Sequence, residues 1–406
     1  MTERLIVNPT LSALQPYPFE RLRTLFAGVT PSSRYTPLSL GIGEPKHPTP
    51  QVIKDAINRH VSSLASYPPT AGSVELRAAI GAWITRRYQL NAAGDGFDAM
   101  RHVLPVNGSR EALFSFAQTV IDRTRDALII CPNPFYQVYE GAALLAGAQV
   151  HYVNMLAERD FRVDYASVPE SVWSKVQLLY CCSPGNPTGK VMNLEDWREL
   201  FALSDRHGFV IASDECYSEL YFDESQPPIG ALQAAHLLGR SGFPRLMVFS
   251  SLSKRSNAPG MRSGFAAGDA ALIEKFLHYR TYHGSAMSPL FQVASIAAWN
   301  DEDHVRDNRA RYIDKFQRGL PLIQSPLATQ MPEGGFYLWV KTPIADTEFA
   351  RRLYAERHVT VLPGSYLGRS AHGINPGANY VRLALVADAQ ECLEAISRVA
   401  DFAHAL

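Results

Sequence analysis

From about residue 100 onward, the chain alternates between short apolar runs and stretches with helical spacing. The apolar runs cover residues 101–106, 127–131, 150–153, 176–182, 209–213, 246–250 and 263–267. Most of them are apolar at nearly every position, which is typical of strands buried on both faces. Between them, apolar residues recur at helical spacing over 109–121 and 194–207. The pattern therefore predicts an α/β fold in which helices cover both faces of a mostly parallel sheet.

The pattern changes after residue 285. A charged helix is predicted over 301–319, strands over 335–340, 360–362 and 380–385, and a terminal helix over 387–404. We therefore expect a large α/β domain over 46–285 and a smaller α+β domain over 286–406. Residues 1–45 contain six prolines, and we expect them to form an arm that packs on the smaller domain or on a partner subunit.

The composition argues against several classes of protein. Lys plus Arg equals Asp plus Glu at 39 each, so the chain has no net charge that would favour nucleic acid or an anionic membrane. No apolar run reaches the ~18 residues that span a bilayer, and residues 1–10 lack the apolar stretch of a signal peptide. The five cysteines form no CxxC pair and the histidines form no HExxH motif. These features indicate reduced thiols in a cytoplasmic protein without a metal site.

A lysine directly after a predicted buried strand is the sharpest chemical feature of the sequence. Lys254 ends the segment Ser251-Leu252-Ser253-Lys254, and strand ends in α/β sheets open into ligand crevices. A lysine amine in such a place can form a Schiff base with an aldehyde, and Ser251, Ser253 and Arg262 could hold a phosphate. Taken alone, however, the segment fits a solvated lysine in a polar loop better than a reactive one.

Three further segments follow predicted strands, and each admits two interpretations. Asp214 and Tyr217 could serve a protonated ring nitrogen and a phenolate oxygen, or Asp214 could simply cap the next helix. The turn over 183–189 has two prolines and two glycines, so it is either an ordinary turn or a rigid support for Asn186. Residues 108–109 begin a helix whose N–H groups can bind phosphate, although a plain capped helix has the same pattern.

Together and in this order, the segments resemble the fold-type I, pyridoxal-phosphate-dependent aminotransferases of class I and II. The resemblance covers nearly the whole chain. Its most specific parts are Ser-Pro-Gly-Asn-Pro-Thr-Gly at 183–189, Asp214-x-x-Tyr217, and Ser-x-Ser-Lys254 followed by Arg262. The resemblance implies that Lys254 is the Schiff-base lysine and that Asp214 pairs with the pyridinium nitrogen. The catalytic set that it implies is Lys254, Asp214 and Tyr217.

The resemblance also implies which residues hold the cofactor, pyridoxal 5′-phosphate. Asn186 and Tyr217 would bond the ring hydroxyl oxygen. Tyr136 would stack on the ring, although a plain half-buried tyrosine fits its surroundings nearly as well. Arg110 stands where related proteins often have lysine or glutamine, so its own role in the cofactor site is open. The phosphate would be held by Gly108, Ser109, Ser251, Ser253 and Arg262, and by Tyr67 from the neighbouring subunit of a homodimer.

For the substrate, the resemblance implies a grip on the α-carboxylate. Arg382, in Tyr380-Val-Arg-Leu-Ala384, matches the arginine that binds this group, and Gly43 matches a backbone contact to it. Further substrate contacts are expected from Asn186, from Tyr17 of the arm, and from Tyr282 and His283 in the segment 280–285.

Three segments are similar to bacterial N-succinyl-diaminopimelate aminotransferases, namely residues 8–22, 40–50 and 181–191. This similarity implies transfer of an amino group between N-succinyl-LL-2,6-diaminopimelate and 2-oxoglutarate in lysine biosynthesis. The alternatives are another class I/II aminotransferase (acting on LL-diaminopimelate, aspartate or aromatic amino acids), a pyridoxal-phosphate carbon–sulfur lyase, and a non-enzymatic ligand sensor. The presence of Lys254, Asp214 and Arg382, and an arm too short for a DNA-binding domain, argue against the sensor.

Overall fold

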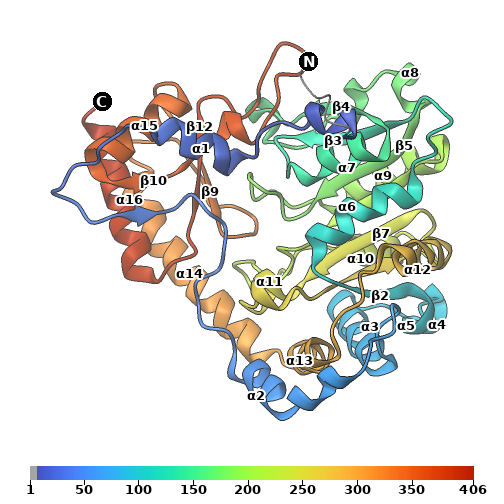
Figure 1. Cartoon of the computed structure of the whole chain (residues 1–406). Helices are drawn as coiled ribbons and strands as arrows, with labels where there is room; N and C mark the ends of the chain where they lie inside the picture. The colour runs from blue at the N-terminus through green and yellow to red at the C-terminus, as the bar shows by residue number, and fades with distance from the viewer. Residues whose placement is uncertain (1–6) are drawn as a thin grey trace, which may run out of the picture.

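The computed structural model describes residues 7–406 and shows two lobes joined by the long helix α14 (Asp303–Ile323) (Figure 1). The larger lobe is built on a seven-stranded sheet. Its strands are, in spatial order, β2 (Val103–Val106), β8 (Gly264–Gly268), β7 (Leu246–Ser251), β6 (Val210–Asp214), β5 (Val176–Cys182), β3 (Leu128–Asn133) and β4 (Gln149–Asn154). Neighbouring strands are parallel except at β8, which runs antiparallel to both β2 and β7. The predicted mostly parallel sheet is therefore confirmed.

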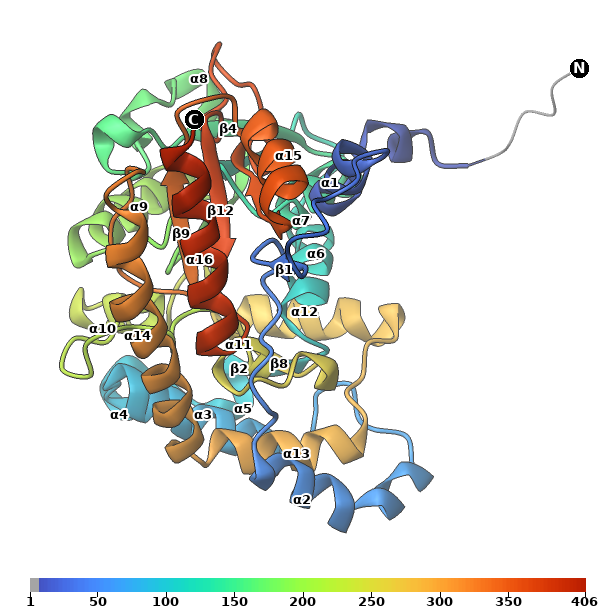
Figure 2. The ribbon, with the colours of Figure 1, turned by 90° about the vertical axis from the view of Figure 1, so that its left-hand side faces the viewer.

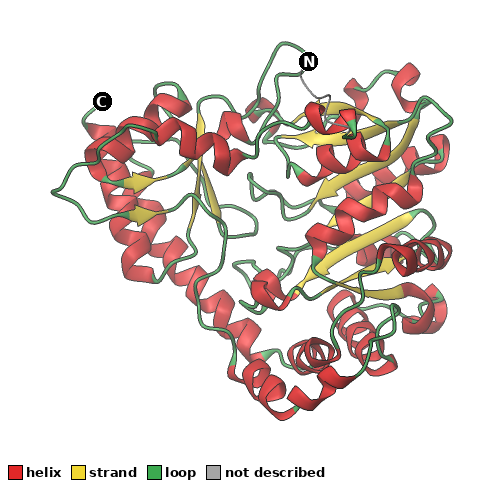
Figure 3. Ribbon diagram, in the orientation of Figure 1, coloured by secondary structure: helices red, strands yellow, loops and turns green. Residues whose placement is uncertain are grey.

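Helices cover both faces of this sheet because its central strands are buried on both sides, as every residue of β6 and β7 is. One face packs against α6 (Ser109–Val120), α7 (Val138–Ala146) and α12 (Ala270–His283). The other face packs against α3 (Val74–Tyr88), α9 (Leu194–His207), α10 (Ala231–Leu237) and α13 (Pro289–Trp299). The remaining helices of this lobe are α2 (Gln51–Arg59), α4 (Ala92–Asp95), α5 (Ala99–His102), α8 (Glu170–Trp173) and α11 (Leu252–Arg255). Figure 3 shows the resulting layers.

The smaller lobe has an antiparallel sheet in the order β11 (Leu362–Pro363), β12 (Tyr380–Ala384) and β9 (Tyr337–Lys341). Helices α14, α15 (Asp346–Arg357) and α16 (Ala389–His404) share its apolar core (Figure 2). The N-terminal arm joins this lobe at two places. Its strand β1 (Leu38–Ser39) pairs with β10 (Val359–Thr360), and its helix α1 (Pro18–Phe26) packs through Leu22 among residues of the smaller lobe.

A few boundaries differ from the sequence-based expectation, for local reasons. Residues 99–102 form α5 instead of the start of a strand, because the Asp98 side chain accepts a hydrogen bond from the Met100 amide and caps a helical turn. The predicted strand over 360–362 is two short strands, because the chain passes from pairing with β1 to pairing with β12. Helix α14 continues past Gly319 to Ile323, whose side chain is fully buried in the core.

Candidate active site

A cavity of about 520 Å³ lies where β6 and β7 end, between the larger lobe, the smaller lobe and the arm. The carboxyl ends of parallel strands are the usual place for ligands in such sheets. The predicted site residues that line it are Tyr17, Gly43, Ser109, Arg110, Tyr136, Asn186, Asp214, Tyr217, Ser251, Ser253, Lys254, Arg262 and Arg382. The fold therefore brings most of the predicted set together in one place, although its members are spread over more than 300 residues of sequence.

Asp214 ends β6 and is buried in the cavity wall. Its Oδ2 accepts a hydrogen bond from the Tyr139 hydroxyl at 2.7 Å, and its Oδ1 accepts one from the Cys216 amide at 3.3 Å. Burial raises the pKa of Asp214, and these hydrogen bonds oppose part of that rise. A protonated ring nitrogen beside Asp214 would favour the ionised carboxylate, because opposite charges attract strongly away from water.

Lys254 lies in the single turn of α11, directly after β7. The Ser251 side chain supports this turn by accepting a hydrogen bond from the Ser253 amide at 3.4 Å. Lys254 Nζ donates to the Gly43 carbonyl at 2.5 Å and lies 5.2 Å from the centre of the Phe336 ring. Burial lowers the pKa of the Lys254 amine to about 8. Lys254 is therefore a partly buried amine in a cavity, and not a solvated lysine in a loop.

Arg382 lies on β12 and is only 3% exposed. Its Nη1 donates to Asn186 Oδ1 at 2.9 Å, and its Nη2 donates to the Gly41 carbonyl at 3.0 Å. The guanidinium also lies 4.2 Å from the centre of the Tyr337 ring. Within residues 7–406, the buried Nε of Arg382 has no acceptor. A buried guanidinium that is fixed on two sides and keeps unused N–H groups is well suited to bind a carboxylate.

Gly108 and Arg262 are packed tightly against each other beside the cavity. Gly108 has φ +83°, a conformation that favours glycine, and a Cβ at this position would lie 2.3 Å from Arg262 Nη2, so the guanidinium would have to move. The next residue, Ser109, begins α6, whose first N–H groups have no side-chain cap. The Cys216 thiol donates to Ser109 Oγ at 2.8 Å and lies 3.8 Å from Ser251 Oγ. Two hydroxyls, an arginine and a helix N-terminus therefore lie close together, a combination that suits a phosphate.

The outer rim of the cavity combines a cation with two aromatic rings. Arg110 Nε donates to the Tyr136 hydroxyl at 2.5 Å, and the guanidinium lies 5.9 Å from the centre of the Tyr17 ring. Tyr17 precedes α1, so the arm itself forms part of the cavity wall. Arg110 is exposed and Tyr17 and Tyr136 are half-buried, so these three side chains lie closer to solvent than Asp214 and Arg382.

Four predicted site residues do not line the cavity of their own chain, namely Gly108, Tyr67, Tyr282 and His283. The Tyr67 side chain is fully exposed and that of Tyr282 is 83% exposed. His283 is also exposed, and its Nδ1 lies 2.7 Å from Ser285 Oγ. Their predicted contributions therefore stay predictions, which for Tyr67 concern the site of a neighbouring subunit. Gly108 reaches the cavity only through its contact with Arg262.

The sequence interpretation missed several residues that shape the cavity. Tyr139 holds Asp214, and Cys216 lies between the hydroxyls of Ser109 and Ser251. Tyr337 on β9 was predicted only as part of a strand, yet its hydroxyl lies 3.0 Å from that of Tyr217. Gly43 leaves room for the Tyr337 hydroxyl, because a Cβ there would lie 2.0 Å from it, but a glycine in the sequence does not indicate which side chain it accommodates.

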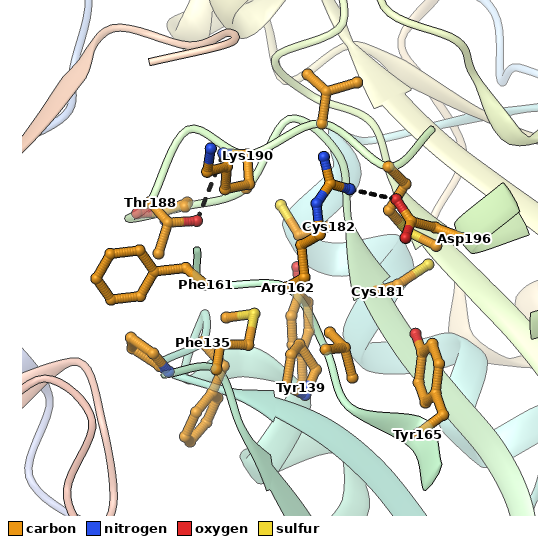
Figure 4. Close-up of a pocket in the computed structure, with 18 residues that line it drawn as sticks. Phe135, Tyr139, Phe161, Arg162, Tyr165, Cys181, Cys182, Thr188, Lys190 and Asp196 are labelled. Carbon is orange, nitrogen blue, oxygen red and sulfur yellow. Dashed lines mark hydrogen bonds and ion pairs between the residues drawn. The ribbon is translucent and has the colours of Figure 1, made fainter. Parts of the chain in front are cut away.

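The turn that carries Asn186 also borders a second cavity of about 50 Å³ (Figure 4). Its walls are mostly apolar and include Phe135, Tyr139, Phe161, Tyr165, Cys181 and Cys182. Arg162 at its edge is already paired with Asp196 at 2.5 Å. Asn186 lines this cavity as well as the larger one, and its Oδ1 accepts the hydrogen bond from Arg382 Nη1. The prediction that the turn is a rigid support for the Asn186 amide stays a prediction.

The described part of the chain has neither a metal site nor a membrane-spanning helix. Over residues 7–406, no group of three or more His, Cys, Asp or Glu side chains is placed to hold a metal ion. Across the same range, no helix has both the length and the apolar composition to cross a membrane.

Known proteins are similar to this chain in both sequence and fold. The family model for aminotransferases of class I and II matches residues 35–399. The LL-diaminopimelate aminotransferase of Maridesulfovibrio salexigens is 30% identical over 396 residues, which cover 96% of this chain and 97% of that protein. A crystal structure of an aminotransferase from Neisseria meningitidis Z2491 has a TM-score of 0.93 at 49% identity, covering 97% of this chain and 99% of that one. The aminotransferase AspB of Helicobacter pylori 26695 has a TM-score of 0.88 at 37% identity, covering 96% and 99%.

Proposed function

Because the chain belongs to the family of class I and II aminotransferases, we propose that it transfers an amino group between LL-diaminopimelate and a 2-oxo acid, 2-oxoglutarate. As a member of this family it is a transaminase that depends on pyridoxal phosphate. The choice of amino acid is carried by one observation, the 30% identity over 96% of the chain to a relative named LL-diaminopimelate aminotransferase. Diaminopimelate is an intermediate on the route to lysine, so the proposal places the enzyme in lysine biosynthesis.

N-succinyl-LL-diaminopimelate, the substrate expected from the sequence, is the second candidate. Residues 8–22, 40–50 and 181–191 support it, whereas the names of the relatives support the unsubstituted amino acid. The two compounds present the same α-carboxylate and amine to the site. They differ at the far end, where one carries an ammonium and the other a succinyl amide. We expect that end to meet Tyr17 and Arg110 on the outer part of the cavity.

The donors in the cavity fit the cofactor. When bound, pyridoxal phosphate supplies an electron sink that stabilises negative charge developing on the substrate Cα. Asp214 would hold a proton on the ring nitrogen, and Asn186 and Tyr217 would bind the ring oxygen. Tyr136 would lie against the ring. The phosphate would be held by Gly108, Ser109, Ser251, Ser253 and Arg262, which lie together around Cys216 and the start of α6.

Lys254 would move the proton of the reaction. Its amine has to be neutral to accept the proton from the substrate Cα, and burial lowers its pKa to about 8, so a useful neutral fraction exists near neutral pH. Arg382 would bind the substrate α-carboxylate with its unused N–H groups and so fix the position of Cα. Lys254 Nζ also donates to the Gly43 carbonyl at 2.5 Å, and this hydrogen bond holds the amine beside the segment that carries Gly43.

Gly108→Ala should weaken binding of pyridoxal phosphate by roughly ten- to a hundred-fold, because the new Cβ would displace Arg262 from the phosphate, and one charge-assisted contact contributes about 1.5–3 kcal/mol. Gly208→Ala is the matched control. Gly208 also has a positive φ, +77°, but nothing lies within 4 Å of its added Cβ. Titration of both apo-proteins with the cofactor, followed by fluorescence, is the measurement. Equal affinity of the two variants would contradict the phosphate site.

We further propose a cytoplasmic homodimer in which each subunit completes the site of the other. Val61 and Leu64, close to Tyr67 in sequence, are 53% and 58% exposed, and such apolar side chains favour contact with protein over water. Tyr67 would then reach the phosphate in the neighbouring site, and Tyr282 and His283 the substrate there. Sedimentation velocity of the active enzyme tests this assembly.

The experiment that tests the proposed function is a comparison of kcat/KM for several amino donors with 2-oxoglutarate as acceptor. LL-diaminopimelate and its N-succinyl derivative are compared with N-acetylornithine, aspartate and phenylalanine, and the keto product is quantified. We expect LL-diaminopimelate to give the highest value. A higher value for N-succinyl-LL-diaminopimelate would select the second candidate. A higher value for any of the other three would contradict the diaminopimelate assignment and leave the transaminase intact.

A further inference from the structure

A chain of partly buried hydrogen bonds runs from α14 to the main chain of Lys254. Lys315 is 1% exposed, and its Nζ lies 2.7 Å from His47 Nε2. His47 Nδ1 lies 2.9 Å from Asn308 Oδ1, and Asn308 Nδ2 donates to the Lys254 carbonyl at 3.2 Å. We call Lys315, His47 and Asn308 the α14 relay. None of the three lines the active-site cavity, yet together they reach the lysine at its centre.

The direction of every bond in the relay follows from the chemistry of its members. A lysine ammonium can only donate, so His47 Nε2 accepts. His47 Nδ1 then carries the ring proton and donates to Asn308 Oδ1, which leaves the Asn308 NH₂ to donate to Lys254. Asn257 Nδ2 donates to the same Asn308 Oδ1 at 2.9 Å and so fixes the orientation of the amide. Burial lowers the pKa of His47 to about 4, which keeps the ring neutral as this direction requires.

The relay also contacts the segments that carry two other parts of the site. Lys315 Nζ donates to the Leu385 carbonyl at 3.0 Å and to the Ala387 carbonyl, just after the strand that carries Arg382. His47 is four residues beyond Gly43, whose carbonyl holds Lys254 Nζ. A partly buried network in which each of these bonds is made favours one arrangement of the segments that it joins.

We propose that Lys315, His47 and Asn308 are positioning residues that hold the main chain of Lys254, and thereby its amine, where the proton transfer needs it. The inference rests on the proposed role of Lys254. Because a displacement of about 1 Å can lower a rate by roughly a hundred-fold, a relay that fixes only the backbone can still control turnover.

Two variants break the relay in different places. His47→Phe keeps an aromatic ring beside Tyr312, whose ring centre is 4.8 Å away, but it can neither donate nor accept. Asn308→Ala removes the bond to the Lys254 carbonyl. For both, we expect kcat to fall by about 10- to 100-fold, while KM for glutamate changes by less than about two-fold, since the partners of Arg382 are untouched. His47→Gln, which retains one donor and one acceptor, should recover part of the loss.

A second measurement does not depend on the reaction. In the apo-proteins, backbone hydrogen exchange over residues 252–257 should become about ten-fold faster in His47→Phe and Asn308→Ala. The control is Arg309→Met on the same helix, which removes the ion pairs with Glu224 at 2.6 Å and with Glu219 at 3.7 Å and leaves the hydrogen bonds of the relay in place. It should lower the melting temperature without changing kcat or this exchange.

The two measurements distinguish a failure of the positioning role from a failure of the proposed function. Two results would overturn the positioning role. The first is an unchanged kcat in both relay variants, and the second is a loss of kcat no larger than the loss measured for Arg309→Met. If the wild-type protein shows no transaminase activity, the proposed function fails on its own. The exchange data then still decide whether the relay holds the backbone of Lys254: faster exchange supports it, and unchanged exchange overturns it.

Discussion

Lys254→Ala should abolish nearly all turnover while the variant still binds pyridoxal phosphate. In the proposed mechanism the substitution removes the amine that would accept the Cα proton, and loss of a positioned general base alone costs about 10²- to 10⁴-fold. It also removes the amine that, as proposed, would anchor the cofactor covalently, which would add to the loss. Cofactor affinity should persist, because the phosphate and ring contacts come from other residues. Single-turnover reaction of the loaded variant with glutamate, followed by absorbance, measures the effect.

The control for this variant is Lys175→Ala. Lys175 is paired at the surface with Asp126 at 2.6 Å and lies outside the cavity, so its loss should leave turnover unchanged. Borohydride treatment of the wild-type protein, followed by peptide mapping, should place the cofactor on Lys254. Attachment to another lysine, or more than a tenth of wild-type turnover in Lys254→Ala, would refute the assignment.

Arg382→Ala should lower kcat/KM for glutamate and for diaminopimelate by similar factors, each roughly ten- to a hundred-fold or more. The reason is that both donors present the same α-carboxylate, and a charge-assisted contact contributes about 1.5–3 kcal/mol. Arg382→Lys keeps the charge but loses the planar fork that reaches Asn186 and Gly41, so it should recover only part of the loss. Steady-state kinetics with each donor provide the comparison.

Tyr17→Ala is the contrasting variant, because Tyr17 lies on the rim where only a long substrate extends. It should reduce kcat/KM for diaminopimelate or its N-succinyl derivative more than for glutamate. If Arg382→Ala affected only one of the donors, or if Tyr17→Ala affected both equally, the proposed orientation of the substrate would be wrong.

The sequence predicts much of the fold because the sheet is buried on both faces. The apolar run at 176–182 and the helical pattern at 194–207 coincide with β5 and α9 to the residue. Where the pattern failed, long-range pairing decided the outcome. Residues 359–363 divide between two sheets because their partners are β1, more than 300 residues earlier, and β12. Nothing in the local sequence carries that information.

The same contrast between local pattern and distant partners holds for the residues of the candidate site. The sequence pattern singles out Asp214 and Lys254 because they follow apolar runs, whereas Arg382 is predicted only through the resemblance to a family. Tyr139, Tyr337 and His47 were missed because their partners are distant in sequence: His47 and Asn308 are 261 residues apart. A single tyrosine on a helix or strand has the pattern of a core residue until the fold shows what its hydroxyl contacts.

The most direct test of the central claim is to follow the amino group itself. The wild-type enzyme loaded with pyridoxal phosphate is given ¹⁵N-labelled glutamate and the keto acid derived from LL-diaminopimelate, and the products are analysed by mass spectrometry. The account predicts that ¹⁵N appears in diaminopimelate in equal amount to the 2-oxoglutarate formed, and that Lys254→Ala shows neither. Release of the label as free ammonia, or no transfer from glutamate to any keto acid, would contradict it.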